Sequence, residues 1–211
     1  MVGDPPAAWC DAGFTVDDDA ICQIGTVRIR LAGRDAGKRI RSWALRDVRL
    51  EPGSEEVDGL PTQFAQTERS RSSGRVDHDN GATQVDHLVV ATPDTARTVG
   101  ALEAIGLDVR RVRDTDAETY GAPMRQTFFR LGEVILEVIG PSEPAGDGPA
   151  QFFGLALTVA DLDALPDRYG EQLGRIKGAV QSGRRIATLR HRDLGMSVAI
   201  AFMDDGAGAI R

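Results

Sequence analysis

Two stretches of this 211-residue chain decide its fold: Val85-Asp86-His87-Leu88-Val89-Val90 and Glu133-Val134-Ile135-Leu136-Glu137-Val138-Ile139. Both alternate as β-strands do, because successive side chains of a strand point to opposite faces. His87 lies on the same face as its apolar second neighbours, so it belongs to a strand and not to a loop. Glu137 lies opposite the apolar residues that would face a core. A carboxylate amid this much apolar surface needs a partner or a ligand.

The sequence around these stretches predicts the order strand, helix and three strands twice. The first copy comprises a strand at 85–90, a helix from Asp94 to Ala104 with Asp94 as its N-cap, and strands at 107–112, 124–131 and 133–139. The second copy comprises a strand at 154–159, a helix at about 161–173, and strands at 175–180, 184–191 and 196–203. Repeated units usually bury a shared face against each other, so we expect the two copies to be paired.

A third, partial copy is expected in residues 1–50. Residues 23–33 align with residues 130–140 without a gap, and the glycines at both ends coincide. The alignment predicts a strand at 23–33, with Arg30 at the place of Glu137, and a further strand within 38–48. Residues 51–80 are rich in Gly, Ser, Arg and Glu, which predicts a linker or a long surface loop with His78 solvated inside it.

Composition narrows the class of partner and the compartment. The net charge of -7 argues against a nucleic-acid or anionic-membrane surface, so the expected partner is a small molecule or another protein. Cys10 and Cys22 form no metal or disulfide pattern and are expected to be reduced thiols of a cytoplasmic protein. We find no signal peptide pattern and no apolar run near the ~20 residues of a membrane span. Motifs of P-loop, HExxH and GxSxG proteins are absent from the sequence.

VDHLVVATPD at 85–94, the helix ending at Gly106-Leu107, and RLGEVILEVIGP at 130–141 resemble the vicinal oxygen chelate superfamily. That superfamily includes glyoxalase I, fosfomycin-resistance enzymes, extradiol dioxygenases and bleomycin-binding proteins, and this chain looks most like a glyoxalase-like domain protein. The resemblance covers residues 85–203. It implies an α+β fold of paired βαβββ modules with curled mixed sheets around a concave site. The implied glyoxalase-like domain is 81–211, with modules at about 85–141 and 152–204.

The resemblance also implies a metal site built from the first and last strand of each module. His87 and Glu137 match these positions, and an imidazole with a carboxylate suits Zn, Fe, Mn or Ni. In the second module, Gly154 and Ala201 stand at the matching positions and cannot ligate a metal. The site is therefore incomplete unless a second subunit, His191 or a neighbouring residue such as Gln126 completes it, and the missing ligands favour a cavity without a metal.

Three hypotheses for the function follow. In the first, a cavity around His87 and Glu137 binds a small organic molecule, with or without a metal. In the second, the protein is a metal-dependent lyase, isomerase or dioxygenase in which Glu137 or His87 moves a proton. In the third, it is a dimeric structural or interaction module; a homodimer is implied by the resemblance in any case. The residues expected to line the cavity are Arg125, Phe128, Phe129 and Phe153.

His87 and Glu137 also have a purely structural interpretation, in which they pair with each other in a polar cavity. Burial tendencies favour a partly buried structural role for His191, on a strand face shared with Ala187 and Leu189. Strand arginines such as Arg125 and Arg130 are expected on solvated faces.

Overall fold

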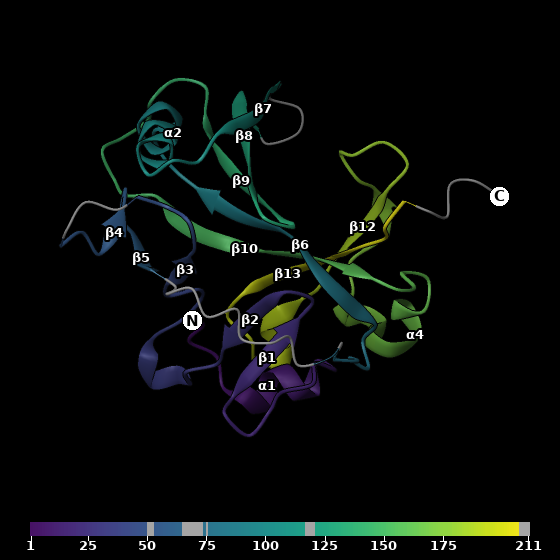
Figure 1. Cartoon of the computed structure of the whole chain (residues 1–211). Coiled ribbons are helices and arrows are strands. Elements are labelled where there is room, and N and C mark those ends of the chain that lie inside the picture. Colours follow the sequence, from purple (N-terminus) through teal and green to yellow (C-terminus); the bar gives the residue numbers. More distant parts are fainter. Residues whose placement is uncertain (50–52, 65–73, 75, 117–120, 207–211) are drawn as a thin grey trace. The chain divides into compact units, whose positions relative to one another are not determined.

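The computed structural model describes residues 1–49, 53–64, 74, 76–116 and 121–206 (Figure 1). The chain divides into two compact units. Unit 1 comprises Met1–Arg41, Ser70–Asp86 and Gly154–Arg211, and unit 2 comprises Ser42–Arg69 and His87–Phe153. The described part of residues 1–50 is thus shared between both units.

The first βαβββ module, which we call the His87 module, lies mostly in unit 2. It consists of β6 (Ala82–Ala91), α2 (Thr95–Ala104), β7 (Val109–Thr115), β8 (Met124–Leu131) and β9 (Val134–Pro141). The strand order is β6-β9-β8-β7. β6 runs parallel to β9, and the other neighbours are antiparallel. The predicted order of elements is confirmed.

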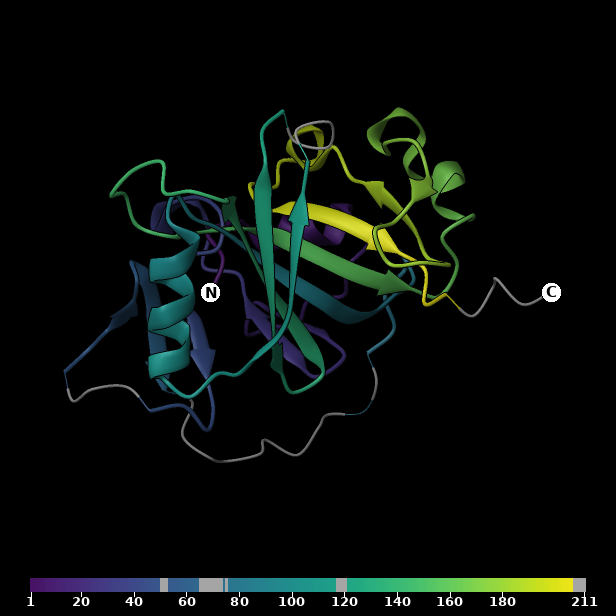
Figure 2. The ribbon, with the colours of Figure 1, turned by 90° about the horizontal axis from the view of Figure 1, so that it is seen from above.

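The sheet of the His87 module has two different faces. Helix α2 begins after Asp94, whose side chain accepts a 3.0 Å hydrogen bond from the Arg97 backbone N–H, and it lies against β8 and β9 (Figure 2). Most apolar side chains of β6, β8 and β9 on the helix-covered face are buried. They include Leu88, Val90, Phe129, Leu136 and Val138. The other face, which carries His87 and Glu137, is only half-buried, and we call it the open face.

Unit 2 also contains a small sheet. Strands β3 (Trp43–Leu45), β4 (Glu56–Val57) and β5 (Leu60–Phe64) form it in the order β3-β5-β4. Of these, β3 lies within the strand expected at 38–48, while β4 and β5 lie where the sequence predicts a linker. Between β4 and β5, the nearly buried Asp58 carboxylate accepts hydrogen bonds from Arg97 Nε at 2.7 Å and from the Thr98 hydroxyl, both on α2. Residues 56–64 are therefore structured, which corrects that part of the linker prediction. Residues 50–52, 65–73 and 75 lie outside the described residues.

The second module, the Gly154 module, lies mostly in unit 1 and repeats the order with shorter elements. It consists of β10 (Gln151–Val159), α4 (Leu165–Tyr169) with the 3-10 turn η2 (Gly170–Gln172), β11 (Lys177–Gly178), β12 (Arg185–Thr188), the 3-10 turn η3 (His191–Leu194) and β13 (Ala199–Met203). The strand order is β10-β13-β12-β11, with β10 parallel to β13. The helix is shorter than predicted, because it begins only at the Leu165-Pro166 pair and ends at Gly170 with φ 51°.

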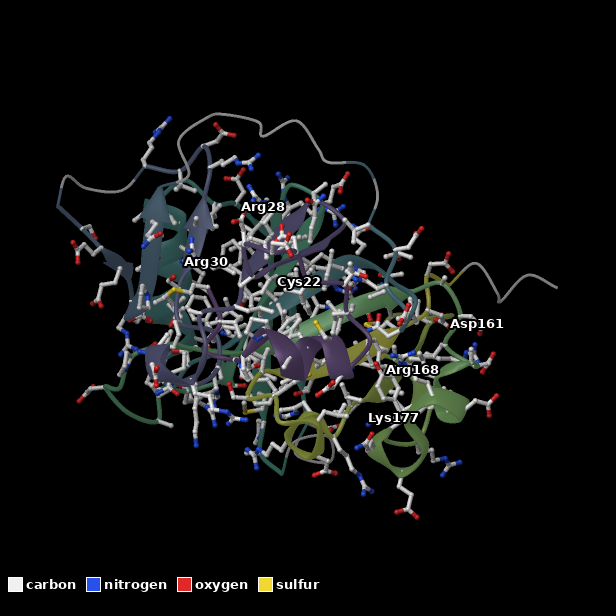
Figure 3. The ribbon with its side chains drawn as sticks, turned by 90° about the horizontal axis from the view of Figure 1, so that it is seen from below. Cys22, Arg28, Arg30, Asp161, Arg168 and Lys177 are labelled. Carbon is white, nitrogen blue, oxygen red and sulfur yellow. The ribbon has the colours of Figure 1, made fainter. Side chains whose placement is uncertain are left out.

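The N-terminal part of unit 1 corrects the prediction of one strand at 23–33. The elements are α1 (Pro6–Asp11), β1 (Ile21–Ile24), β2 (Val27–Arg30) and the 3-10 turn η1 (Arg34–Ala36). Gly25, with φ 58°, turns the chain so that Ile24 pairs with Val27. The aligned residues Leu131 and Val134 pair in the same way at the β8–β9 turn. The alignment therefore matched two hairpins, and Arg30 is an exposed residue of β2 (Figure 3).

Two side chains of unit 1 that could carry chemistry, His78 and Cys22, are buried in its core. His78, expected to be solvated, is buried: its Nδ1 accepts from the Thr15 backbone N–H at 3.0 Å, and its Nε2 donates to the Gln23 carbonyl at 2.9 Å. This corrects its assignment to a solvated loop. Burial raises the pKa of Cys22 to about 12, with smaller contributions from Cys10 and Asp17, so this thiol stays protonated and unreactive at neutral pH (Figure 3).

Candidate functional site

The open face of the His87 module brings His87 and Glu137 together. His87 lies on β6 and Glu137 on β9, and the alternation of both strands points them to the same side. His87 Nε2 is 3.7 Å from Glu137 Oε2, and each side chain is 12% exposed. Glu137 Oε1 accepts a 2.6 Å hydrogen bond from Gln126 Nε2 on β8. The carboxylate is thus held through one oxygen, while the other faces the imidazole.

Arg113 extends this polar row to the edge strand β7. It is the Cα partner of Gln126 and therefore shares the open face with it. The NH1 nitrogen of its guanidinium is buried and has no hydrogen-bond partner within the described residues. Sequence reasoning did not single out Arg113, although the alternation of Val109–Thr115 places it on one face of its strand. The signal was weak because β7 is largely exposed and rich in charged residues.

Apolar side chains surround the polar row. Val89 and Ala91 on β6 and Ile135 and Ile139 on β9 are all partly exposed on the open face, as is Phe128 on β8. Partly exposed aliphatic and aromatic side chains around a few polar groups are typical of small-molecule sites.

The structure places the four expected cavity residues in different environments. Phe128 is the Cα partner of Glu137 and lies on the open face. Phe129 is 1% exposed in the core on the helix-covered face, and Arg125 shares that side and forms a 2.8 Å ion pair with Asp114. Both residues are therefore removed from the candidate site. Phe153, on β10, is 58% exposed.

The Gly154 module supplies no counterpart to His87 or Glu137. In the His87 module, His87 pairs with Ile135 and Val89 with Glu137. In the second module, Gly154 pairs with Ala199 and Ala156 with Ala201, so the same register places Gly154 and Ala201 at the matching positions. A Cβ on Gly154 would lie 2.5 Å from the Ala199 carbonyl oxygen and 2.8 Å from the Ala199 Cβ. Close strand packing thus requires the glycine and excludes a ligand there.

The donor set does not fit the metal centre that the resemblance implies. Protein sites for Zn and similar ions use three or four side-chain ligands. No group of three or more His, Cys, Asp or Glu side chains in the described part of the chain could hold a metal ion. Gln126, a residue suggested as a further ligand, donates its amide N–H to Glu137. His87 and Glu137 therefore form a polar pair, and they supply only two of the metal ligands that the resemblance implies.

His191 belongs to unit 1, whereas His87 and Glu137 belong to unit 2. It is half-buried in η3, not on a strand, and burial lowers the pKa of its imidazole. A shallow hollow of about 270 Å³ is lined by residues 188–193. The partial burial of His191 agrees with the structural role expected for it, while its predicted place on a strand is wrong. Its suggested role as a further metal ligand stays a prediction.

Comparison with known proteins finds distant likenesses to solved structures. No family model matches the chain, and no curated protein matches it in sequence. Methylmalonyl-CoA epimerase from Mycobacterium tuberculosis has a TM-score of 0.47 at 17% identity over 61% of this chain and 92% of the epimerase. Glyoxalase I from Zea mays has a TM-score of 0.40 at 18% identity, over 58% of this chain and 43% of the enzyme. 4-Hydroxymandelate synthase from Streptomyces coelicolor, as a triple mutant, has a TM-score of 0.45 at 13% identity, over 69% and 57%.

These likenesses are too distant to transfer an activity. Among the helices described, none is long and apolar enough to cross a membrane.

The strand order of the chain itself establishes the fold. Two modules, each with its first strand parallel to its fourth, have the topology that the resemblance to the vicinal oxygen chelate superfamily predicted. The fold is α+β and glyoxalase-like.

Proposed function

We propose that the open face of the His87 module binds a small organic molecule, with Glu137 as the group that orients it. The observation that supports this most is the Glu137 carboxylate itself. It is 12% exposed on a mostly apolar surface, and Gln126 holds only one of its oxygens. A desolvated carboxylate gains most from a further hydrogen-bond donor.

The geometry assigns a task to each side chain. Gln126 fixes the carboxylate by donating to Oε1 at 2.6 Å. Oε2, 3.7 Å from His87 Nε2, is the oxygen that would accept an O–H or N–H from a ligand lying between the two groups. The half-exposed Val89, Ile135 and Phe128 would contact the apolar part of the ligand.

A second candidate function is proton transfer at the same place. A carboxylate that one neighbour orients and that faces an imidazole resembles a general base with its positioning group. Glu137 Oε2 would accept the proton from an activated C–H or O–H, and His87 would stabilise the resulting anion through Nε2–H. The observation in favour of this candidate is the position of His87 Nε2, 3.7 Å from Glu137 Oε2.

Three variants test the proposed function. A library of small organic molecules is screened by ligand-observed NMR against the wild-type protein, Glu137→Gln, His87→Ala and the exposed control Glu133→Gln on the β8–β9 turn. We expect hits that bind the wild type and Glu133→Gln equally and that bind Glu137→Gln at least tenfold more weakly. Hits that bind all four proteins alike would contradict the proposal. Turnover of a hit that Glu137→Gln abolishes while retaining some affinity would favour proton transfer.

A further inference from the structure

We infer that the small molecule taken by the open face is a carboxylic acid, and that Arg113 binds its carboxylate while Glu137 accepts its O–H or N–H donor. This rests on the proposed function and names the class of molecule. The structural basis is a polar row that crosses all four strands of the module: Arg113 on β7, Gln126 on β8, Glu137 on β9 and His87 on β6.

Arg113 is the cation in this row whose charge is not matched by a protein group. No carboxylate of the described residues forms an ion pair with it, whereas the arginines at 97, 125, 184 and 185 all have such partners. Its NH1 nitrogen is nevertheless buried, although the residue as a whole is only partly buried. A buried guanidinium N–H without an acceptor is costly, and an anion placed beside it removes that cost.

The charge balance of the face favours a carboxylate over a phosphate. One guanidinium matches one negative charge, and its planar fork suits a planar carboxylate. A phosphate dianion would leave an unmatched negative charge on the same face as Glu137. The amide of Gln126 lies between the cation and Glu137, which separates the acid end of the ligand from the donor end.

The spacing of the row limits the size of the molecule. Arg113 and Glu137 are two strands apart and offset by two residues along the strands, because Gln126, the partner of Arg113, pairs with Ile139. This corresponds to about 12 Å between their backbones. Arg and Glu side chains are long enough to shorten this gap, so a ligand that meets both would need its acid group and its donor group only a few bonds apart. A hydroxy acid with an apolar substituent satisfies all three parts of the face: Arg113, Glu137 and the patch around Phe128.

The test uses three matched probes: 2-hydroxy-3-phenylpropanoate, its primary amide, and phenyl phosphate. Dissociation constants are measured by NMR titration with the wild-type protein, Arg113→Met and Arg130→Met. Arg130 is an exposed arginine on the same face of β8, so its variant controls for net charge. We expect the acid to bind the wild type and Arg130→Met within twofold of each other, and to bind Arg113→Met about tenfold more weakly. The amide is expected to bind the wild type about as weakly as the acid binds Arg113→Met.

The remaining outcomes distinguish the carboxylate inference from the proposed function. Equal binding of acid and amide, both lost in Glu137→Gln, would overturn the carboxylate inference and leave the proposed function standing. Tighter binding of phenyl phosphate would overturn the choice of carboxylate. Binding of none of the probes by the wild-type protein would overturn the carboxylate inference, whereas the proposed function is decided separately by the library screen. Thermal unfolding of Arg113→Met is measured alongside, and a midpoint several degrees below wild type would assign Arg113 a structural role and overturn the inference.

Discussion

His78 shows how a single titratable side chain can link the stability of the fold to pH. Its Nδ1 accepts the Thr15 backbone N–H, so the proton of the neutral ring is on Nε2, where it meets the Gln23 carbonyl. Burial lowers the pKa of His78, although the Gln23 carbonyl, Asp77 and Asp79 oppose the shift. Protonation at Nδ1 would break the bond to Thr15.

The lowered pKa predicts a loss of stability in mild acid. Below about pH 6.5 the unfolded chain binds a proton that the folded chain does not bind, so the free energy of unfolding falls as the pH falls. Urea unfolding at pH 7.5, 6.5 and 5.5 measures this slope, and His78→Gln is expected to make it shallower. Part of the slope should remain, because the pKa of His191 is lowered as well. An identical slope in His78→Gln would show that His78 does not contribute.

The position of single residues could be predicted from the sequence where the alternation of a strand determines the face on which a side chain lies. His87 was expected on a strand and Glu137 on a strand face opposite the core, and the burial of β9 alternates as predicted. Phe129 and Arg125 could not be assigned so easily, because adjacent Phe128 and Phe129 leave open which ring faces the core. His78 was misplaced because its burial depends on Thr15 and Gln23, more than 50 residues away.

At the scale of elements, the β4–β5 hairpin is fixed to α2 by one carboxylate. Asp58 lies at the turn with φ 49°, is 9% exposed, and accepts from both Arg97 and Thr98. The Thr98 hydroxyl also donates to Thr92 Oγ1 at 2.7 Å, so the hairpin, the helix and the end of β6 form one hydrogen-bonded group.

Asp58→Asn is therefore expected to destabilise unit 2 by about 1 to 3 kcal/mol, because it removes the charge while asparagine still tolerates the turn conformation. Asp114→Asn is the control, since Asp114 forms a similar bidentate pair with Arg125 in an exposed position and should change stability little. Chemical denaturation followed by far-ultraviolet circular dichroism compares the two. Equal losses would show that burial of Asp58 does not strengthen its bonds.

Element prediction was best where apolar periodicity was strong and poorest where turns decided the structure. β6, α2, β8 and β9 were expected within a few residues of their bounds. The hairpins at Gly25 and Asp58-Gly59 were missed because a short strand, a turn and a short strand look like one strand or a polar loop. The weak elements of the Gly154 module were overestimated in length for the same reason.

At the scale of the whole molecule, the two modules share a topology and differ in their side chains. Only the His87 module carries polar ligating groups at the two matched positions. We therefore predict that the protein, purified without a polyhistidine tag, contains much less than one metal ion per chain by elemental analysis. A chelator should leave its thermal midpoint unchanged. Near-stoichiometric metal that is lost in His87→Ala would contradict this and would point to ligands from a second subunit. The homodimer itself stays a prediction.

The tight contact of Gly154 with Ala199 limits what point mutation can do to this protein. Installing a histidine at 154 would force the backbones of β10 and β13 apart before any new ligand could be positioned. A designer who wants a symmetric four-ligand centre must first widen that strand pair, whereas changes to specificity on the Glu137 side meet no such barrier. The asymmetry of the molecule is thus built into its backbone spacing, and adaptation to new small molecules is confined to one half of the repeat.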